Sequence, residues 1–551
     1  MNTPVVIHRG RGIDCFALDQ RTFRVRISTE RGAYQRVELC YTLNKYTWNE
    51  ARQTVAIRQW ASDDLWDYYQ TDVSGKDTRL AYVFILHTRR ETFYFSEEGL
   101  SRHYAFPQGY CHFFQNPFIH ACDVHKVVSW ADTAVAYQIF PERFANGLGK
   151  KAYVNSAWDS DPTPHALFGG DLPGIEKHLD YLSDLGVNCL YLTPVFPSPS
   201  NHKYDVVDYE TVDTAFGGEA ALRSLIDAVH KRNMRVLLDG VFNHCSTLFK
   251  PFQDAVRHGK GSAYWDWFFI EGDRVNLKEA NYFTFGRVSS MPKLNTGHPE
   301  VIKYFCGIGA YWVREYHIDG WRLDVTDELS ADFLRAFRKA VKAENPDALI
   351  VGEIWQNPAS WLRGDQADGV MNYALTKALT DYLVHRTQDA QGTACRLNRL
   401  LARTAPQASR MMLNLIGSHD THRFLTLLKG DKPRLKLAFC LLFFYVGIPC
   451  IYYGDEIGME GGYDPGCRKG FPWEERLWDA SLRELVKRLC ILKTSGRLAG
   501  DEMAIEAFGD ILSVKRSGAG LMINAADQPA AAVINGCTHT LEACEYRIDR
   551  L

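Results

Sequence analysis

Two acidic residues, each placed just after a short apolar segment, could together carry out nucleophilic and acid/base chemistry. Asp324 follows the apolar segment 320–323, and Glu353 follows the segment 348–351. Cleavage of a glycosidic bond needs one ionised carboxylate that attacks the anomeric carbon and one protonated carboxyl that gives a proton to the leaving oxygen. The two residues are therefore candidates for this pair. If they work by direct displacement, we expect their carboxyl groups to lie about 5–5.5 Å apart.

The neighbours of the two residues along the chain predict how each is tuned. Arg322 should orient Asp324 and hold it ionised, which would lower its pKa. Glu353 lies between Gly352 and Ile354, so we expect an apolar setting that favours its neutral form. Trp355 could in addition shield this carboxyl from water.

Two further polar clusters follow apolar segments. Asp239 and His244 come after the segment 235–238, and His419 and Asp420 come after 412–416. A single Asp at a strand end is more often a cap or an ion-pair partner, so the ordered set carries the inference. We expect Asp239 to be structural and to hold Arg322 or a loop. His419 and Asp420 could also be metal ligands, but the other His and Asp clusters of such a site are missing.

Eight short apolar strands alternate with helical segments and would position these residues. The helices are indicated by apolar residues at i, i+3, i+4 and i+7, as in 222–229 and 301–308. Eight strands predict a fold of the α/β class, a closed (β/α)8 barrel whose active site lies at the carboxyl ends of the strands. The predicted strands are 134–140, 188–192, 235–239, 320–323, 348–351, 369–371, 412–415 and 449–453.

The rest of the chain divides around this barrel. Residues 1–123 read as short alternating strands and predict an N-terminal β-sandwich. The barrel would occupy 124–475, with an inserted subdomain at about 245–298, where the rhythm breaks after the third strand. Residues 476–551 predict a helix and a small C-terminal β-sandwich.

Composition narrows the partners and the compartment. The 551 residues include 63 basic and 66 acidic side chains, which gives no reason to expect a nucleic-acid or membrane partner. The N-terminus carries no basic segment leading into an apolar run, so we expect a cytoplasmic protein. The apolar stretch 437–453 is shorter than a bilayer span and contains a Pro, so it predicts a buried helix followed by a buried strand.

The four polar clusters, in this order, resemble the motif regions of the α-amylase family of glycoside hydrolases, and in particular the cyclomaltodextrinase, neopullulanase and maltogenic amylase group. Segments 136–147 and 197–205 also resemble that group, as do Trp321, Glu328 and segment 462–468. The resemblance runs from about residue 5 into the C-terminal domain.

The resemblance implies a role for each site residue. Asp324 would be the nucleophile, Glu353 the acid/base, and Asp420 a third carboxylate that stabilises the transition state. The substrate-binding residues would fall into four sets. They are His244 and His419 at the sugar before the cleaved bond, Tyr204 stacked on that sugar, Asp464 and Arg468 on the next sugar, and Glu328 and Trp355 on the leaving-group side. His202 and Arg322 would also be substrate-binding residues.

The loop after the first strand departs from the resemblance at a possible metal site. Relatives often hold calcium after the first strand, where Asn146, Gly170 and Asp171 would be the candidate ligands. Lys150 and Lys151 in the same loop are unfavourable neighbours for a hard cation. We therefore expect no required cofactor and no metal, and leave calcium near these residues as an open alternative.

Together these features predict a retaining α-glucan hydrolase that cleaves α-1,4 bonds in cyclomaltodextrins, pullulan, malto-oligosaccharides or starch, with transglycosylation as a side activity. Thr326, Asp327 and Gln356 depart from the group's usual residues, which leaves the balance between hydrolysis and transfer open. A glucosyl transferase and a non-catalytic carbohydrate-binding protein are the alternatives, and the three carboxylates argue against the second. The N-terminal sandwich would form a homodimer that narrows the active site.

Overall fold

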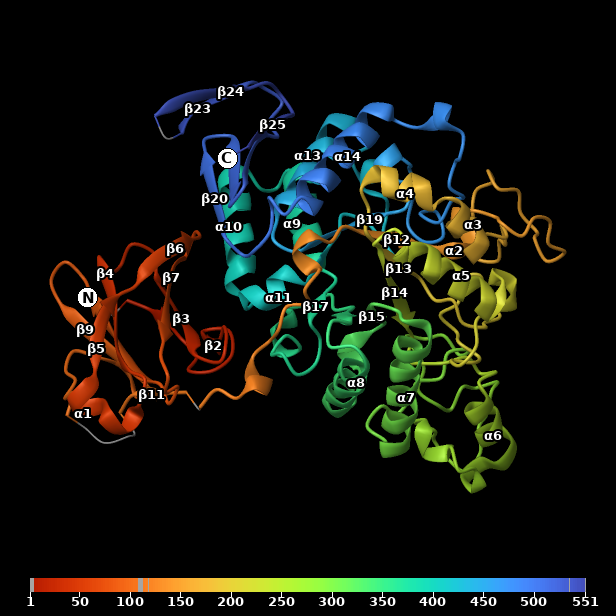
Figure 1. Cartoon of the computed structure of the whole chain (residues 1–551), viewed down its shortest axis with the longest axis horizontal. Coiled ribbons are helices and arrows are strands. Elements are labelled where there is room, and N and C mark those ends of the chain that lie inside the picture. Colours follow the sequence, from red (N-terminus) through yellow and green to blue (C-terminus); the bar gives the residue numbers. More distant parts are fainter. Residues whose placement is uncertain (1–3, 108–111, 117, 535, 551) are drawn as a thin grey trace.

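The protein is built around an eight-stranded parallel barrel, as predicted (Figure 1). The computed structural model describes residues 4–107, 112–116, 118–534 and 536–550. Neighbouring strands pair in the order β17, β16, β15, β14, β13, β12, β19, β18, and a parallel bridge between Met371 and Leu413 joins the two ends. The strands are β12 (Ala136–Ile139), β13 (Cys189–Leu192), β14 (Arg235–Gly240), β15 (Gly320–Leu323), β16 (Leu349–Gly352), β17 (Gly369–Val370), β18 (Leu413–Asn414) and β19 (Ile448–Tyr452).

Helices cover the outside of the barrel, which explains why most residues of its strands are apolar and buried. The predicted stripe on α5 is buried at Leu222, Leu225, Ile226 and Val229. The main helices of this layer are α3 (Leu172–Lys177), α4 (Leu179–Leu185), α5 (Gly218–His230), α7 (Pro299–Tyr316), α8 (Ala331–Glu344), α9 (Tyr373–Leu383), α10 (Ala390–Ala402), α11 (Pro406–Arg410), α12 (Phe424–Leu427) and α13 (Lys432–Phe444).

The long apolar stretch forms α13 and then β19, both buried, as the sequence predicted. Among the described residues, no helix combines the length and apolar character needed to cross a bilayer. The described cysteines are all free thiols.

The insertion lies between β14 and α7. It contains α6 (Lys250–His258) and is held together by isolated bridges, such as those joining Phe268 to Leu294 and Ile270 to Tyr282. Another bridge pairs His244 with Lys293 and fastens the insertion to the end of β14. Figure 1 shows it at the end of the molecule opposite to the N-terminal domain.

The N-terminal domain is a sandwich of two antiparallel sheets around its own apolar core. One sheet contains β1 (Val6–Ile7), β2 (Cys15–Ala17), β3 (Thr22–Glu30), β6 (Arg58–Ser62) and β7 (Trp66–Ser74). The other contains β4 (Arg36–Thr42), β5 (Gln53–Ala56), β8 (Ala81–His87), β9 (Thr92–Ser96), β10 (Gly99–Ser101) and β11 (Phe114–Gln115). The short helix α1 (Trp48–Ala51) lies between β4 and β5.

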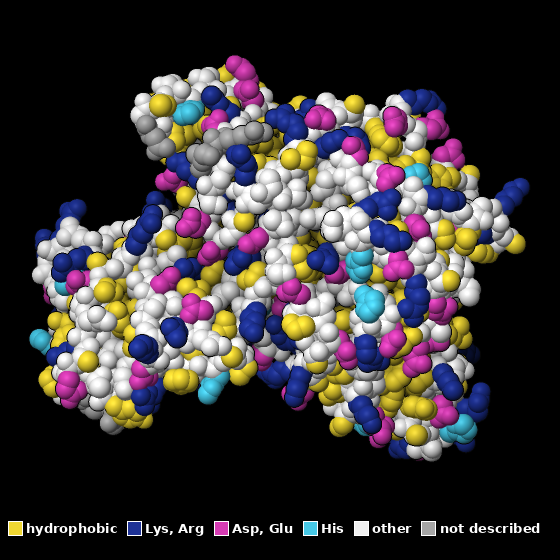
Figure 2. All heavy atoms as spheres, in the orientation of Figure 1, with side chains coloured by type: hydrophobic (Ala, Val, Ile, Leu, Met, Phe, Trp, Pro, Cys, Tyr) yellow, Lys and Arg dark blue, Asp and Glu magenta, His cyan; other side chains and the backbone are white. Residues whose placement is uncertain are grey.

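The C-terminal domain follows α14 (Ala480–Thr494) and consists of two small antiparallel sheets. Ile511 and Met522 from one sheet pack against Ile534 and Leu541 from the other. The strands are β20 (Met503–Phe508), β21 (Ile511–Arg516), β22 (Ala519–Asn524), β23 (Ala530–Ile534), β24 (Cys537–Leu541) and β25 (Glu545–Arg550). On the face shown in Figure 2, basic and acidic side chains are intermixed over all three domains.

Candidate active site

A cavity of about 480 Å³ opens at the carboxyl ends of the barrel strands. It brings together almost all of the residues that the sequence singled out. Its lining includes His202, Tyr204, His244, Asp324, Glu328, Glu353, Trp355, His419, Asp420, Asp464 and Arg468. Arg322 is the one predicted site residue outside the lining, because its side chain is fully buried beneath these groups.

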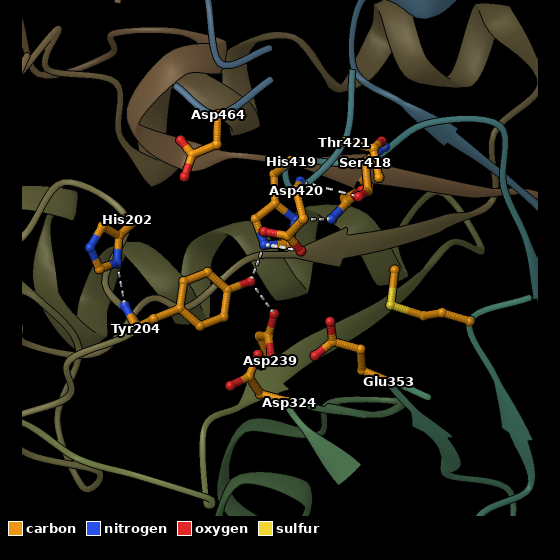
Figure 3. A network of polar contacts seen from close by, with 12 residues as sticks. His202, Tyr204, Asp239, Asp324, Glu353, Ser418, His419, Asp420, Thr421 and Asp464 are labelled. Carbon is orange, nitrogen blue, oxygen red and sulfur yellow. Dashed lines mark hydrogen bonds and ion pairs between the residues drawn. The ribbon is translucent and has the colours of Figure 1, made fainter. Parts of the chain in front are cut away.

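Arg322 is the centre of the charge arrangement under the cavity. Its Nη1 donates to Asp239 Oδ1 and to Asp324 Oδ1, both at 2.8 Å. Its Nη2 lies 2.9 Å from Glu353 Oε2, close enough for an ion pair but without the angle of a hydrogen bond. One guanidinium thus serves three carboxyl groups, which Figure 3 shows gathered near the Tyr204 hydroxyl. Asp239 holds Arg322, as predicted.

The carboxyl groups around Arg322 outnumber the positive charge, and this affects their protonation. Burial raises the pKa of Asp324 well above its ordinary value, and the charge of Glu353 raises it further, while Arg322 opposes both effects. Burial likewise raises the pKa of Asp239. The prediction that Arg322 lowers the pKa of Asp324 overall was wrong, because desolvation outweighs one shared cation. Asp324 and Asp239 therefore keep a proton more readily than isolated carboxyls do.

The predicted apolar setting of Glu353 was also wrong. The Val325 backbone N–H donates to Oε2 at 2.9 Å, and Trp355 Nε1 donates to Oε1 at 3.0 Å. Trp355 is 50% exposed and stacks on Tyr373 with ring centroids 3.5 Å apart, so it holds the carboxyl by a hydrogen bond and does not cover it. Both oxygens of Glu353 are thus oriented by donors from outside its own strand.

His419 is fixed from both sides. Its Nδ1 lies 2.8 Å from Gln138 Nε2, and its Nε2 lies 2.5 Å from the Tyr204 hydroxyl and 3.2 Å from Asp420 Oδ2. The Tyr204 hydroxyl also donates to Asp239 Oδ2 at 2.9 Å. Burial lowers the pKa of His419 well below its ordinary value, so the ring is neutral. Tyr204 therefore links the third strand's carboxylate to the seventh strand's histidine.

His244 presents an unused nitrogen to the cavity. Its ring is 1% exposed, and its Nε2 has no hydrogen-bond partner and lies 3.9 Å from Asp324 Oδ2. Burial lowers its pKa to about 3. Phe285 of the insertion stacks on the ring with centroids 4.6 Å apart. A buried polar atom without a partner is costly, so this nitrogen is available for a hydroxyl of a bound sugar.

Arg468 joins Asp420 and Asp464 on another side of the cavity. Its Nη2 donates to Asp420 Oδ1 at 3.3 Å, its Nη1 lies 3.0 Å from Asp464 Oδ1, and its Nε donates to the His419 carbonyl at 2.8 Å. Burial raises the pKa of Asp420. Nearby, the Tyr204 backbone N–H donates to His202 Nδ1 at 3.1 Å, so that ring is held in one tautomer.

The rim on the Glu328 side is polar and open. Lys293 of the insertion lies 2.9 Å from Glu328 Oε2, and Gln356 donates to Asp327 Oδ2 at 3.1 Å. Sequence reasoning missed several lining residues, and those from the insertion lack any helical or strand period that could have revealed them. The missed lining residues are Phe285, Val288, Met291 and Val325, whereas Asp327 and Tyr463 lie in segments that the sequence had already singled out.

The loop after β12 does not fit a calcium ion. The fully buried Asp171 accepts hydrogen bonds from the backbone N–H groups of Gly147 and Gly174 at 2.8 and 2.7 Å, and its Oδ2 lies 2.7 Å from Lys151 Nζ. The same ammonium donates to the Gly169 carbonyl at 2.8 Å. Asn146 Oδ1 is taken by a backbone N–H. The lysine therefore already provides the positive charge, and a second cation would be repelled.

A (β/α)8 barrel that gathers carboxyl groups at the ends of its fourth, fifth and seventh strands is the scaffold of a glycoside hydrolase. The comparisons make this specific: the chain belongs to the alpha-amylase family. Residues 138–487 match the alpha-amylase catalytic domain, and residues 1–120 match the alpha-amylase N-terminal Ig-like domain.

Similar proteins cover most of the chain. A cyclomaltodextrinase from Geobacillus thermopakistaniensis (strain MAS1) is 43% identical over 503 residues, 90% of this chain and 85% of that protein. An intracellular maltogenic amylase from Bacillus subtilis is 40% identical over 500 residues, 90% of this chain and 84% of that protein. The solved structure of a cyclomaltodextrinase superposes with a TM-score of 0.89 at 39% identity, covering 96% of this chain and 92% of that one.

Proposed function

We propose that the protein hydrolyses α-1,4-glucosidic bonds in cyclomaltodextrins, pullulan, malto-oligosaccharides or starch with retention, using Asp324 as nucleophile and Glu353 as acid/base. The observation that carries the proposal is the shared guanidinium of Arg322, which lies 2.8 Å from Asp324 Oδ1 and 2.9 Å from Glu353 Oε2 at the base of one cavity. Two carboxyls on one guanidinium support a mechanism of direct displacement, and Asp420 would supply the third carboxylate.

In the first step, an oxygen of Asp324 attacks the anomeric carbon while Glu353 gives its proton to the glycosidic oxygen. The C1–O bond of the glucan breaks, and an ester bond between C1 and Asp324 forms. Positive charge that develops on the sugar is stabilised by Asp420, and the free His244 Nε2 receives a sugar hydroxyl. Glu353 is left ionised, with the Val325 and Trp355 N–H groups as donors to its charge.

In the second step, Glu353 takes a proton from water, and the water oxygen attacks C1 from the face that the leaving group has vacated. The ester bond breaks and releases the Asp324 carboxylate, so that one water is consumed for each glucosidic bond. When a second sugar hydroxyl replaces water, the same step gives transglycosylation. The open rim beside Glu328 and Trp355 offers space for such an acceptor.

The decisive test compares Asp324→Asn and Glu353→Gln with the wild type on β-cyclodextrin, pullulan and soluble starch in the presence of EDTA. We expect both variants to lose about 10⁴-fold or more in rate, because each removes one partner of the carboxyl pair. Asp332→Asn, an exposed carboxylate on α8, is the control and keeps the wild-type rate. Products are followed by chromatography and the first-formed anomer by NMR.

An activated substrate separates the two roles. Maltosyl fluoride has a leaving group that needs no proton, so Glu353→Gln should still form the glucosyl ester from it, whereas Asp324→Asn should not. Inversion of the first product, or equal loss in both variants on the fluoride, would contradict these assignments. Wild-type protein without turnover on any glucan would instead favour a transferase or a binding protein.

The proposal extends to cofactor, assembly and location. The protein works without calcium, since Lys151 supplies the charge beside Asp171. It forms a homodimer through the N-terminal domain. It acts in the cytoplasm, and the similarity to an intracellular maltogenic amylase supports this location. Loss of activity in EDTA would contradict the first point, and a monomeric mass by light scattering would contradict the second.

A further inference from the structure

A second cavity, of about 470 Å³, lies where the three domains meet, and it shares no lining residue with the active site. Strands β3, β6 and β7 of the N-terminal domain form one wall. Residues from α10 and α11 of the barrel and from β20 and β21 of the C-terminal domain form the others. Figure 1 shows β6 beside β20 and α10, far from the α6 insertion.

Two arginines of this cavity are buried without a carboxylate partner among the described residues. Arg26 is 7% exposed and donates only to the Thr404 carbonyl at 2.8 Å and to Gln70 Oε1 at 3.2 Å, which leaves its Nη2 without an acceptor. Arg516 is 3% exposed and donates only to backbone carbonyls. Burial lowers the pKa of each guanidinium to about 10. Buried charges in proteins are normally paired, so this arrangement lacks an anion.

The other cationic side chains of the cavity differ in how they are paired. Arg24 is neutralised by Asp72 and Asp501, at 2.8 and 3.2 Å. Arg58 and Lys515 also line the cavity, and within the described part of the chain neither has an ion-pair partner. Five cations and two carboxylates line the cavity in all.

The cavity also offers a neutral donor and an apolar face. The Trp60 indole lines it, and its Nε1 is buried without a hydrogen-bond acceptor. The Arg26 guanidinium lies 5.5 Å from the centre of the Trp60 ring. A ligand that bears several acceptor oxygens on one side and the apolar C–H face of a sugar ring on the other would use all of these groups.

We propose that this interdomain cavity binds a small phosphate-bearing molecule, either orthophosphate or the phosphate ester of a sugar. Phosphate provides the multiple acceptors and the double negative charge that unpaired guanidinium groups recognise. The volume is in the range of small-molecule sites and leaves room for a hexose beside Trp60. A bound phosphate would connect the N-terminal and C-terminal domains through Arg26 and Arg516.

The test is isothermal titration calorimetry of the full-length protein with orthophosphate, glucose 6-phosphate and glucose, at an ionic strength held constant with potassium chloride. We expect saturable binding of both phosphates that depends on Arg26, whereas any glucose bound at the active site should be unaffected by Arg26→Gln. Arg26→Gln should weaken binding about tenfold or more, because it removes a charge-assisted hydrogen bond. If Arg26→Gln does not fold, the more exposed double variant Arg58→Gln/Lys515→Gln tests the same charge and should weaken binding severalfold.

Lys76→Gln, an exposed lysine of the N-terminal domain outside the cavity, is the matched control and should bind as the wild type does. Tighter binding of glucose 6-phosphate than of orthophosphate would identify the sugar ester, and the reverse order would identify the free ion. Absence of saturable phosphate binding, phosphate binding that Arg26→Gln and the double variant leave unchanged, or glucose binding that Arg26→Gln weakens as much as phosphate binding would overturn the proposal.

Discussion

Two buried carboxylates, Asp171 in the loop after β12 and Asp324 at the end of β15, are treated differently by the fold. Asp171 is fully buried, and the Lys151 ammonium and backbone N–H groups satisfy its oxygens. Asp324 is 5% exposed and shares its single cation, Arg322, with Asp239 and Glu353.

This difference in charge compensation distinguishes Asp171, a carboxylate that holds a loop, from Asp324, a carboxylate that can react. The hydrogen bonds of Asp171 are complete, so its charge is compensated and its oxygens have no reason to move. Asp324 has one oxygen on Arg322, while the other faces the cavity and His244 at 3.9 Å. Incomplete compensation costs stability, and it leaves an oxygen free to attack.

The comparison predicts its largest effect at Lys151. Lys151→Met keeps the length of the side chain but leaves Asp171 without its cation, and breaking a buried pair from one side costs about 3 kcal/mol or more. We expect a correspondingly lower free energy of unfolding in urea, with the activity of the folded fraction unchanged. Lys150→Met changes an exposed lysine in the same loop and should have almost no effect. Equal stability of the two variants would show that Asp171 does not need its cation.

Asp324→Asn should raise the free energy of unfolding, whereas Lys151→Met should lower it. Since the folded-state pKa of Asp324 is raised, the folded protein binds more protons than the unfolded chain between the two pKa values, and its stability falls as pH rises through that range. The Asn side chain does not titrate, so the variant does not lose stability as pH rises through this range. At neutral pH it should therefore be more stable than the wild type by about 1 kcal/mol or more.

The advantage of Asp324→Asn should fade as the pH falls toward 3.8, the ordinary value for the carboxyl. Thermal unfolding of both proteins over this pH range checks the prediction. A variant that is less stable than the wild type at neutral pH would mean that the Arg322 contact outweighs the cost of burial.

The smallest effect concerns the donor to Glu353. Trp355→Phe keeps a ring to stack on Tyr373 but removes the N–H that lies 3.0 Å from Oε1. A lost hydrogen bond of about 1 kcal/mol corresponds to about a fivefold lower kcat/KM. Trp361→Phe, whose ring packs nearby against an apolar cluster, is the control for loss of indole. Similar kinetics for both variants would limit Trp355 to a packing role.

The sequence was sufficient for the barrel because each strand is a short apolar run with a polar residue at its end. The eight predicted strands are all present, and the residues that follow them, such as Asp324 and Asp420, meet in one cavity. Order along the chain is enough for this inference, since parallel strands place their carboxyl ends at the same side of the barrel.

The environment of Glu353 could not be predicted from the residues next to it in the chain. Gly352 and Ile354 suggested an apolar setting for Glu353, but its partners are Trp355 two residues further on and Arg322 and Val325 on the adjacent strand and loop. The carboxyl separation of about 5–5.5 Å stays a prediction. Gln138, which fixes His419, was missed although it is a lone polar residue in the buried strand β12, and that signal was available.

The insertion between β14 and α7 has a consequence for how this enzyme can change. Phe285, Val288 and Met291 form a wall of the cavity, yet they belong to a segment that leaves the barrel after one strand and returns before the next helix. Arg322, Asp324 and Glu353 instead lie on, or directly after, strands β15 and β16. The residues that form this wall therefore lie on a different segment of the chain from the reacting carboxyls. Substitutions in that segment can change which glucan fits without replacing a reacting group.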